Sequence, residues 1–273
     1  MFEDIIRAVN ERVKTRVSSE NDYVGEDGLL HCGECREPKQ CRVAFPEREM
    51  TVYCVCACEK QRIREAERRA HAREHEIMRR QCFANEKFRT ATLETDDRQN
   101  ESLSRMAAQY ADSFTRTARW LLLHGSCGTG KSHAAAMITN RVIEQGYSAR
   151  FITVSEAERL LWNAADKWAA YRELLYTDLL VIDDLGAERS TEFTQEIRYN
   201  LIDGRLRTGM PCIITTNLTL QDLFHPGSQA DQRLFSRLCE CAIPFAVNGR
   251  DRRREAFLQN GRKPLSELLT PIT

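Results

Sequence analysis

The sequence predicts an α/β protein in which a parallel sheet of five strands lies between helices, preceded by a small cysteine-rich module. Three observations lead to this fold class. Strand-like apolar runs alternate with helix-like segments from residue 120 onward, which is typical of a parallel sheet covered by helices. A glycine-rich loop joins the first of these strands to the following helix. Six of the eleven cysteines fall between Cys32 and Cys58, ahead of the alternating pattern.

Composition limits the class of protein. The 273 residues allow one sizeable domain and a smaller one, and 42% hydrophobic with 29% charged residues fits a folded globular chain. Forty Lys and Arg balance forty Asp and Glu, so any surface that binds nucleic acid must be local. No apolar run approaches the roughly 18 residues that span a membrane. The charged segment Met1–Lys14 does not resemble a signal peptide, so we expect a cytoplasmic protein without a membrane partner.

The expected elements follow in chain order. Apolar residues at helical spacing predict an amphipathic helix over Met1–Ser19. The Arg-rich segment Glu59–Arg80 contains no Gly or Pro and predicts a charged helix, for which a solvated connector is favoured over a nucleic-acid contact. Beyond Cys82, strands are expected at 121–124, 149–154, 179–183, 212–216 and 242–247, with helices at 132–146, 155–176, 195–208 and 232–238.

The loop after the first of these strands matches the phosphate-binding pattern G-x-x-x-x-G-K-[ST] in full. Its residues are Gly125, Ser126, Cys127, Gly128, Thr129, Gly130, Lys131 and Ser132, with His133 next. Glycines let the backbone wrap an anion, and the start of the following helix adds its positive end. Lys131 can reach the β- and γ-phosphates, and the Ser132 hydroxyl can ligate Mg²⁺. The loop therefore predicts ATP binding, with a chance match to the pattern as the weaker alternative.

Polar side chains end two of the later strands. Asp183 is expected to hold Mg²⁺ and Asp184 to orient the attacking water. Asn217 is expected to help position that water, and an ordinary turn asparagine is the alternative. Together with the glycine-rich loop, these residues predict hydrolysis of the terminal phosphate of ATP.

Arginines form two further candidates. Arg233 and Arg237 are four residues apart and therefore share one helical face. An arginine from a neighbouring subunit can stabilise the charge that develops on a γ-phosphate, and two solvated surface arginines are the alternative. The basic run Arg250–Arg254 could sense a phosphate, contact DNA or be solvated.

With these motifs in order, the chain resembles the AAA+ helicase loaders of the DnaC type and the related IstB-type ATPases of transposons. The resemblance covers roughly Cys82–Arg254 and rests on Gly125–Ser132, Leu179–Gly186, Thr215–Asn217 and Arg233–Arg237. It implies the roles of sensor 1 for Asn217, arginine finger for Arg237, its companion for Arg233 and late nucleotide-contacting arginine for Arg253. The chain then divides into a helix and zinc-binding adaptor over 1–60, a charged helix and linker over 61–90, and an AAA+ ATPase domain over 91–273.

The resemblance also implies a function. ATP would bind between subunits of an oligomer that loads the hexameric replicative DNA helicase onto single-stranded DNA. Ser155–Tyr176 stands where initiator-clade proteins carry an inserted helix that meets single-stranded DNA, with Lys167, Trp168 and Arg172 as candidates. We nevertheless expect Trp162 and Trp168 to be packing residues. AAA+ ATPases usually have Glu where Asp184 stands, so hydrolysis is expected to be slow and regulated.

Three alternative functions stay open. One is a transposition ATPase that remodels duplex DNA for a transposase, against which the cysteine module argues mildly. Another is a small-molecule phosphotransferase with a substrate lid. The third is a DNA-binding module that binds ATP without hydrolysing it.

The cysteine cluster predicts zinc. Cys32-x-x-Cys35 supplies two thiolates, and a tetrahedral site needs two more from Cys54-x-Cys56-x-Cys58. We expect Cys32, Cys35, Cys56 and Cys58, with Cys54 as the nearest substitute, then Cys41 and His31; free cysteines and an iron–sulfur site are the alternatives. The cysteine-rich segment is short and has few large apolar residues. Its stability would therefore come from the metal. By resemblance, such a module docks on the helicase.

Overall fold

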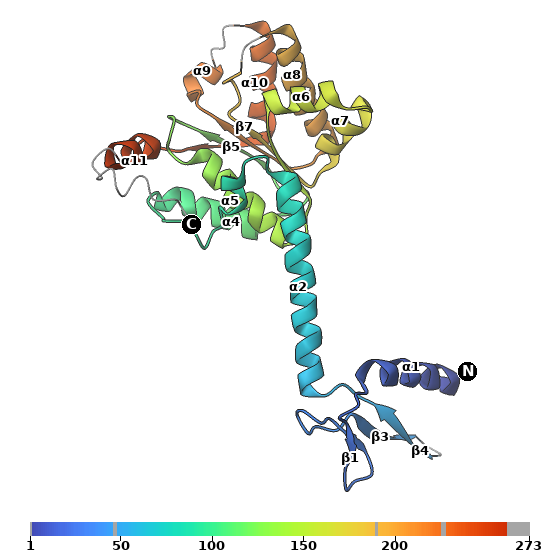
Figure 1. The fold of residues 1–273 in the computed structure, drawn as a ribbon. Coiled ribbons are helices and arrows are strands. Elements are labelled where there is room, and N and C mark those ends of the chain that lie inside the picture. The colour runs from blue at the N-terminus through green and yellow to red at the C-terminus, as the bar shows by residue number, and fades with distance from the viewer. Residues whose placement is uncertain (1, 46–47, 189–190, 225–227, 261–273) are drawn as a thin grey trace. The chain divides into compact units, whose positions relative to one another are not determined.

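A computed structural model describes residues 2–45, 48–188, 191–224 and 228–260 (Figure 1). The chain divides into two compact units, Met1–Glu74 and His75–Thr273. The division falls inside the helix α2 (Ala57–Cys82), which the sequence predicts as a charged connector. Among the described helices, none is long and apolar enough to cross a membrane.

The described part of the N-terminal unit contains two helical segments and four short strands. Its elements are α1 (Phe2–Val17), β1 (Tyr23–Val24), β2 (Leu30–His31), β3 (Gln40–Phe45), β4 (Arg48–Tyr53) and the first part of α2. The strands form two antiparallel pairs, β1 with β2 and β3 with β4. Asn10 on α1 accepts a hydrogen bond of 2.7 Å from the backbone N–H of Tyr53, which ties α1 to β4.

The second unit is built on a parallel sheet in the order β6-β7-β8-β5-β9. Its strands are β5 (Trp120–His124), β6 (Ala149–Thr153), β7 (Leu179–Asp183), β8 (Cys212–Thr216) and β9 (Ala242–Ala246). The five-stranded α/β fold predicted from the sequence is therefore confirmed, strand by strand. β7 and β8 are buried throughout because helices cover both faces of the sheet.

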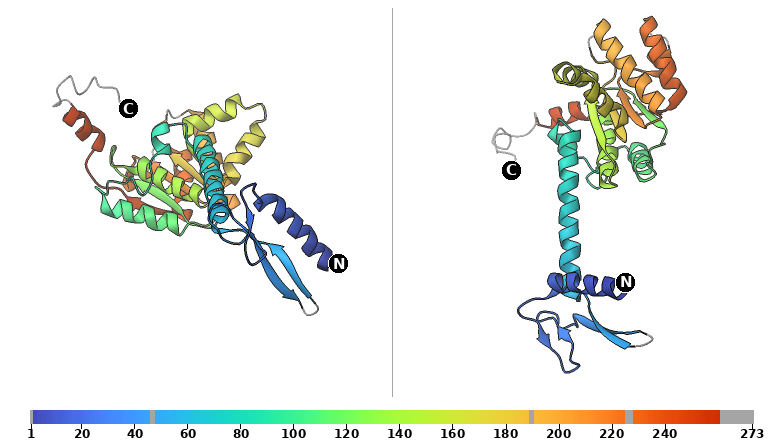
Figure 2. Two further views of the ribbon diagram at one scale, coloured as in Figure 1. Left: turned by 60° about the horizontal axis from the view of Figure 1, so that its bottom comes forward. Right: turned by 90° about the vertical axis from the view of Figure 1, so that its right-hand side faces the viewer.

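The helices form two layers, which Figures 1 and 2 show on opposite faces of the sheet. They are α3 (Glu86–Arg89), α4 (Glu101–Asp112), α5 (Lys131–Glu144), α6 (Val154–Asn163), α7 (Lys167–Tyr176), α8 (Glu192–Thr208), α9 (Leu220–Phe224), α10 (Gln229–Cys241) and α11 (Arg252–Asn260). Alternate residues of β5 supply the two cores: Leu121 and Leu123 pack with α4 and α5, while Trp120 and Leu122 pack with α8 and α10. This layering brings the carboxyl ends of β5, β7 and β8 to one edge.

The helix predicted over Ser155–Tyr176 is two helices, which corrects the sequence analysis. α6 ends at Asn163, and the following Ala164 is extended. Asp166 then caps α7, its carboxylate accepting a hydrogen bond of 2.9 Å from the N–H of Ala169. The cap satisfies an N–H at the start of α7 that a continuous helix would have bonded internally.

A buried arginine fixes the end of α7. Arg205 on α8 is fully buried, and its guanidinium donates to the carbonyls of Leu175 at 2.7 Å, Thr177 at 2.6 Å and Pro211 at 2.6 Å. Burial lowers the pKa of Arg205 to about 10. A cation beside the last carbonyls of a helix is favourable, so Arg205 anchors α7 against α8.

Candidate functional site

The glycine-rich loop leaves β5 at the carboxyl edge of the sheet. Gly125 has φ +139°, and a Cβ at this position would overlap the carbonyl oxygen of Val247. Gly128 has φ +75°, and a Cβ there would overlap the carboxylate of Asp251. Both positions therefore need glycine, and the loop is held closely between β5 and the segment that precedes α11.

Lys131 lies at the centre of the site. Its residue is 4% exposed, and its ammonium donates to the carbonyls of Gly125 and Ser126 at 2.8 Å. The same ammonium donates to Oδ1 of Asn217 at 2.7 Å, which links the loop to the end of β8. Burial lowers the pKa of Lys131 below its ordinary value.

The two acids after β7 have different environments. Asp183 is buried, and Thr215 donates to its Oδ1 at 2.6 Å. Burial raises the pKa of Asp183, while hydrogen bonds from Thr215 and Ser132 oppose that rise. Asp184 has the left-handed φ of +53°, and its N–H donates to Thr215 Oγ1 at 2.9 Å. Asp183 is thus placed beside Ser132, where the two could share a magnesium ion.

Asp184 faces the phosphate side of the site. Asn217 donates from Nδ2 to Asp184 Oδ1 at 3.5 Å, so the expected water-positioning pair is brought together. No role was predicted for Thr215, although its hydroxyl donates to the Asp183 carboxylate and accepts from the backbone N–H of Asp184. The only available signal was its place in Thr-Thr-Asn at the end of a buried strand.

A cavity of about 510 Å³ opens at this edge, a volume in the range of ligand pockets. Of the expected residues, Lys131, Ser132, His133, Asp184, Asn217 and Arg253 line it, together with Cys127, Gly128 and Gly130. Lys87 and Phe88 also line it from the segment before the sheet, and the sequence analysis missed both. Glycine backbone, a buried ammonium and two acids together fit a nucleoside triphosphate with magnesium.

The basic run Arg250–Arg254 contributes to the same cavity. Arg252 and Arg253 both line it, and the N–H of Arg252 donates to the Gly128 carbonyl at 3.0 Å. Arg252 also pairs with Asp97, which lines the same cavity. Arg253 is therefore at the position expected of a nucleotide-contacting arginine.

The arginines of α10 lie elsewhere. Arg233 and Arg237 are exposed, and neither is among the described residues that line the cavity. Arg237 pairs with Asp203 at 3.6 Å and with Glu240 at 3.3 Å. They do not reach the nucleotide site of their own chain, so action on a neighbouring subunit stays a prediction.

The chain matches the family of IstB-like ATP binding proteins over residues 50–242, which is most of its length. It belongs to that family. Membership makes the chain a P-loop ATP-binding protein and accounts for the cradle of glycines around Lys131.

Relatives of this IstB-like protein include replicative helicase loaders. DnaI of Bacillus subtilis is 27% identical over 51% of this chain and 49% of its own length, and DnaC of Escherichia coli K12 is 28% identical over 53% and 60%. A putative ATP-binding protein in an insertion sequence of Mycobacterium tuberculosis is 29% identical over 48% and 57%. The chain thus spans about half the length of the relatives it matches.

Solved structures establish the fold of the IstB-like chain. The crystal structure of DnaI aligns with TM-score 0.54 and 25% identity over 63% of this chain and 95% of that one. The DnaC helicase loader aligns with TM-score 0.55 and 21% identity over 60% of this chain and 100% of that one. The likeness supports an AAA+ arrangement of the sheet and its helices.

The cysteine cluster of this IstB-like protein has the geometry of a metal site. The sulfurs of Cys32, Cys35, Cys56 and Cys58 all lie within 4.8 Å of one another. They are the four that the sequence analysis placed first. A hydrogen bond from the backbone N–H of Cys58 is the main reason that the pKa of Cys35 falls to about 6, which favours the thiolate that a metal needs. Burial raises the pKa of Cys56, and a hydrogen bond with Cys56 raises the pKa of Cys58, so these two thiols favour the protonated form until a cation binds. Four thiolates fit a tetrahedral zinc ion.

The substitutes considered for this site lie outside the group. Cys54 donates to the carbonyl of Pro38 at 3.3 Å, and Cys41 is exposed. His31 contacts Asp27 at 3.0 Å and the carbonyl of Arg36 at 3.1 Å.

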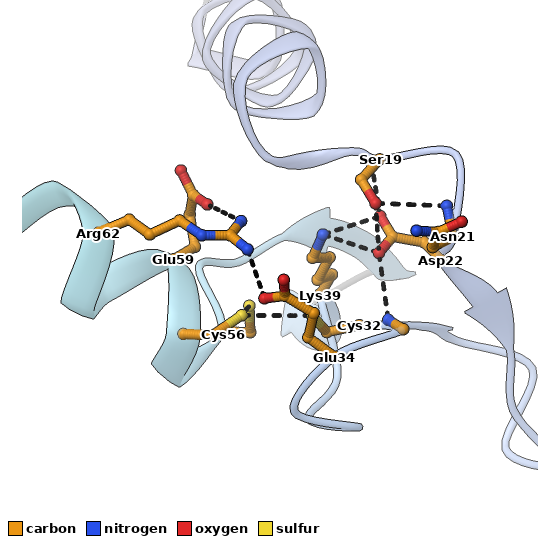
Figure 3. A network of polar contacts seen from close by, with 11 residues as sticks. Ser19, Asn21, Asp22, Cys32, Glu34, Lys39, Cys56, Glu59 and Arg62 are labelled. Carbon is orange, nitrogen blue, oxygen red and sulfur yellow. Dashed lines mark hydrogen bonds and ion pairs between the residues drawn. The ribbon is translucent and has the colours of Figure 1, made fainter.

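Ion pairs hold the loops around the cysteines, as Figure 3 shows. The buried Lys39 ammonium contacts both oxygens of Asp22 at 2.8 Å, and Asp22 also accepts from the N–H of Ser19 at 2.7 Å. Arg62 on α2 pairs with Glu34, which stands between Cys32 and Cys35. These contacts fix the first cysteine pair against the start of α2.

Trp162 on α6 and Phe193 on α8 form an exposed aromatic surface, and Trp168 on α7 is a further exposed ring. Trp162 is 69% and Trp168 63% exposed, so the expectation that both are packing residues is wrong. The Phe193 ring meets Trp162 edge-on at 6.3 Å, and the Lys167 ammonium lies 5.4 Å from the Trp162 ring centre. The two indoles lie on separate helices, α6 and α7, which one continuous helical pattern could not indicate.

Proposed function

We propose that this protein is an ATP-dependent replication protein that loads the hexameric replicative helicase onto single-stranded DNA. The observation that carries the proposal is a cysteine unit, separate from the ATP-binding unit, that exposes apolar side chains. Val24 is 69% exposed, Val9 54% and Tyr23 44%. Exposed apolar side chains of this kind suit a protein partner.

ATP hydrolysis follows from the carboxyl edge of the sheet. Ser132 and Asp183 would hold Mg²⁺, which when bound neutralises charge on the β- and γ-phosphate oxygens. Asp184 and Asn217 would orient the attacking water, and Lys131 would bind the phosphates. Arg237, assisted by Arg233, would act on the γ-phosphate held by the next subunit of an oligomer.

Changing Val24 to Asp should prevent binding to the helicase while leaving ATP binding intact. The charge would lie on the exposed surface of the cysteine unit and oppose burial against a partner. Native mass spectrometry of the full chain with the host's replicative helicase, with and without ATP, measures the complex.

Ile77→Asp is the matched control, because Ile77 is 49% exposed and lies outside the N-terminal unit. We expect the wild type and Ile77→Asp to form the complex. If neither the wild type nor Ile77→Asp binds the helicase in any nucleotide state, the proposed loader function is wrong. If Val24→Asp binds as well as Ile77→Asp, this surface is not the docking site.

The aromatic surface supports a contact with single-stranded DNA, because indole rings stack on bases and Lys167 adds a positive charge. Changing Trp162 to Ala should weaken binding of a labelled oligonucleotide by roughly 10-fold, as loss of one stacked base does. Fluorescence anisotropy in the presence of ATP measures this affinity. Trp162→Phe keeps an aromatic face and should retain most of it, so equal losses in both variants would contradict stacking.

A second candidate function is transposition. The relative from an insertion sequence and the family description both favour it. It predicts ATP-dependent binding of duplex DNA in preference to single strands and no complex with the helicase, so the two assays above separate it from the loader.

A further inference from the structure

The buried guanidinium of Arg198 joins the loop that follows β7 to α10, the helix that carries Arg233 and Arg237. Arg198 on α8 is 7% exposed and donates to Oε1 of Glu188 at 3.1 Å. Its other terminal nitrogen donates to Oδ1 of Asp231. Glu188 in turn accepts from the N–H of Gly186 at 3.0 Å, two residues beyond Asp184. A single side chain therefore contacts both segments.

Asp231 belongs to the first turn of α10. Its Oδ2 accepts from the Ser228 hydroxyl at 2.7 Å, and its N–H donates to the same hydroxyl at 3.1 Å, so Asp231 bonds the N-cap residue of the helix twice. Further along α10, Arg237 contacts Asp203 of α8. The start of α10 is thus held to α8 by Arg198 and Asp231, and a helix transmits the position of its first turn to the residues that follow.

The bridge is difficult to replace. The side chains of Arg198 and Glu188 are 9% and 5% exposed, so solvent cannot supply an equivalent partner. Without the Arg198–Asp231 bond, the buried guanidinium keeps Glu188 as its remaining carboxylate, and one terminal nitrogen is left without its bond in the protein interior, which is costly. We expect the first turn of α10 then to shift relative to α8.

We propose that Arg198 is a positioning residue, which through Asp231 holds the arginines of α10 where they can act on the nucleotide of the next subunit. The inference rests on the proposed action of Arg237 in trans. It adds that the arginine supplied to a neighbour is set in place from the supplier's own β7–α8 loop, which begins at the proposed water-orienting residue Asp184.

Mixed oligomers test the inference. Lys131→Ala subunits can supply Arg237 but cannot hydrolyse ATP, whereas Arg237→Ala subunits can hydrolyse only with an arginine from a neighbour. Equal mixtures of the two, with single-stranded DNA present, should recover ATPase activity. Adding Asp231→Asn to the Lys131→Ala subunit should reduce that recovered rate by at least about 10-fold, as expected for a misplaced catalytic group.

The effect should depend on which subunit carries the substitution, and this dependence distinguishes a positioning role from a general loss of structure. Asp231→Asn in the Arg237→Ala subunit should leave the recovered rate within about twofold of the unmodified mixture, because that subunit supplies no arginine. Arg198→Lys in the supplying subunit should also reduce the rate, because a lysine cannot bond both carboxylates in a fixed geometry. Thermal melting of each variant monitors folding.

Two results would overturn the inference. The first is full recovery with Asp231→Asn in the supplying subunit. The second is an equal loss whichever subunit carries it. A mixture of Lys131→Ala and Arg237→Ala that recovers no activity would instead refute the action of Arg237 in trans, and the inference with it.

Discussion

Replacing Asp184 with asparagine is expected to stop most ATP hydrolysis while leaving ATP affinity nearly unchanged. Asp184 faces the cavity beside Asn217, whereas the proposed magnesium ligands are Asp183 and Ser132. Asparagine has the same shape and tolerates the left-handed φ of +53°, so the fold should persist. An amide cannot accept a proton from water, so turnover should fall by about 10²-fold or more.

Steady-state phosphate release and the affinity for a fluorescent ATP analogue measure the two effects separately. Asp183→Asn is the matched control, because loss of that carboxylate should weaken magnesium-dependent ATP binding itself. Unchanged turnover in Asp184→Asn would exclude Asp184 as the group that orients water. It would favour a DNA-binding module that binds ATP without hydrolysing it.

The second large effect concerns metal. Among the residues of Met1–Glu74 whose side-chain burial the structure describes (8–15, 18–44 and 49–74), only Cys32, Lys39 and Cys56 are buried, so this part of the N-terminal unit has almost no hydrophobic core. If zinc binds the four cysteines, it supplies most of the folding free energy, on the order of 10 kcal/mol in comparable small sites. Removing zinc with a chelator should therefore unfold the two strand pairs and leave the ATP-binding unit folded.

Hydrogen exchange on the full chain measures this, because it reports each unit separately. Cys56→Ser should reproduce the effect of the chelator and release zinc. Cys41→Ser is the matched control, because Cys41 is exposed and outside the group of four sulfurs. The zinc assignment is wrong if the two serine variants exchange alike or if the purified protein holds no zinc.

The phosphate site of the ATP-binding unit could be predicted from the sequence because its residues come from short, local motifs. Consecutive residues supply the glycine loop, and parallel strands deliver their ends to one edge, so Asp183, Asp184 and Asn217 had to meet near Lys131. The four clustered cysteines could be predicted for the same reason, because zinc requires four close thiolates and the chain offers few combinations of four nearby cysteines. Strand positions followed from continuous apolar runs, which burial on both faces demands.

The sequence by itself therefore determined the ATP-binding fold, the phosphate site and the cysteines that could hold a metal. Only the tertiary structure decided which side chains act together across elements. The Trp162 ring meets Phe193 on another helix, the hydroxyl of Thr215 bonds the Asp183 carboxylate from a neighbouring strand, and Arg198 joins Glu188 to Asp231. Such contacts join residues that are distant in sequence, and no periodicity or motif records them because packing of the folded chain creates them.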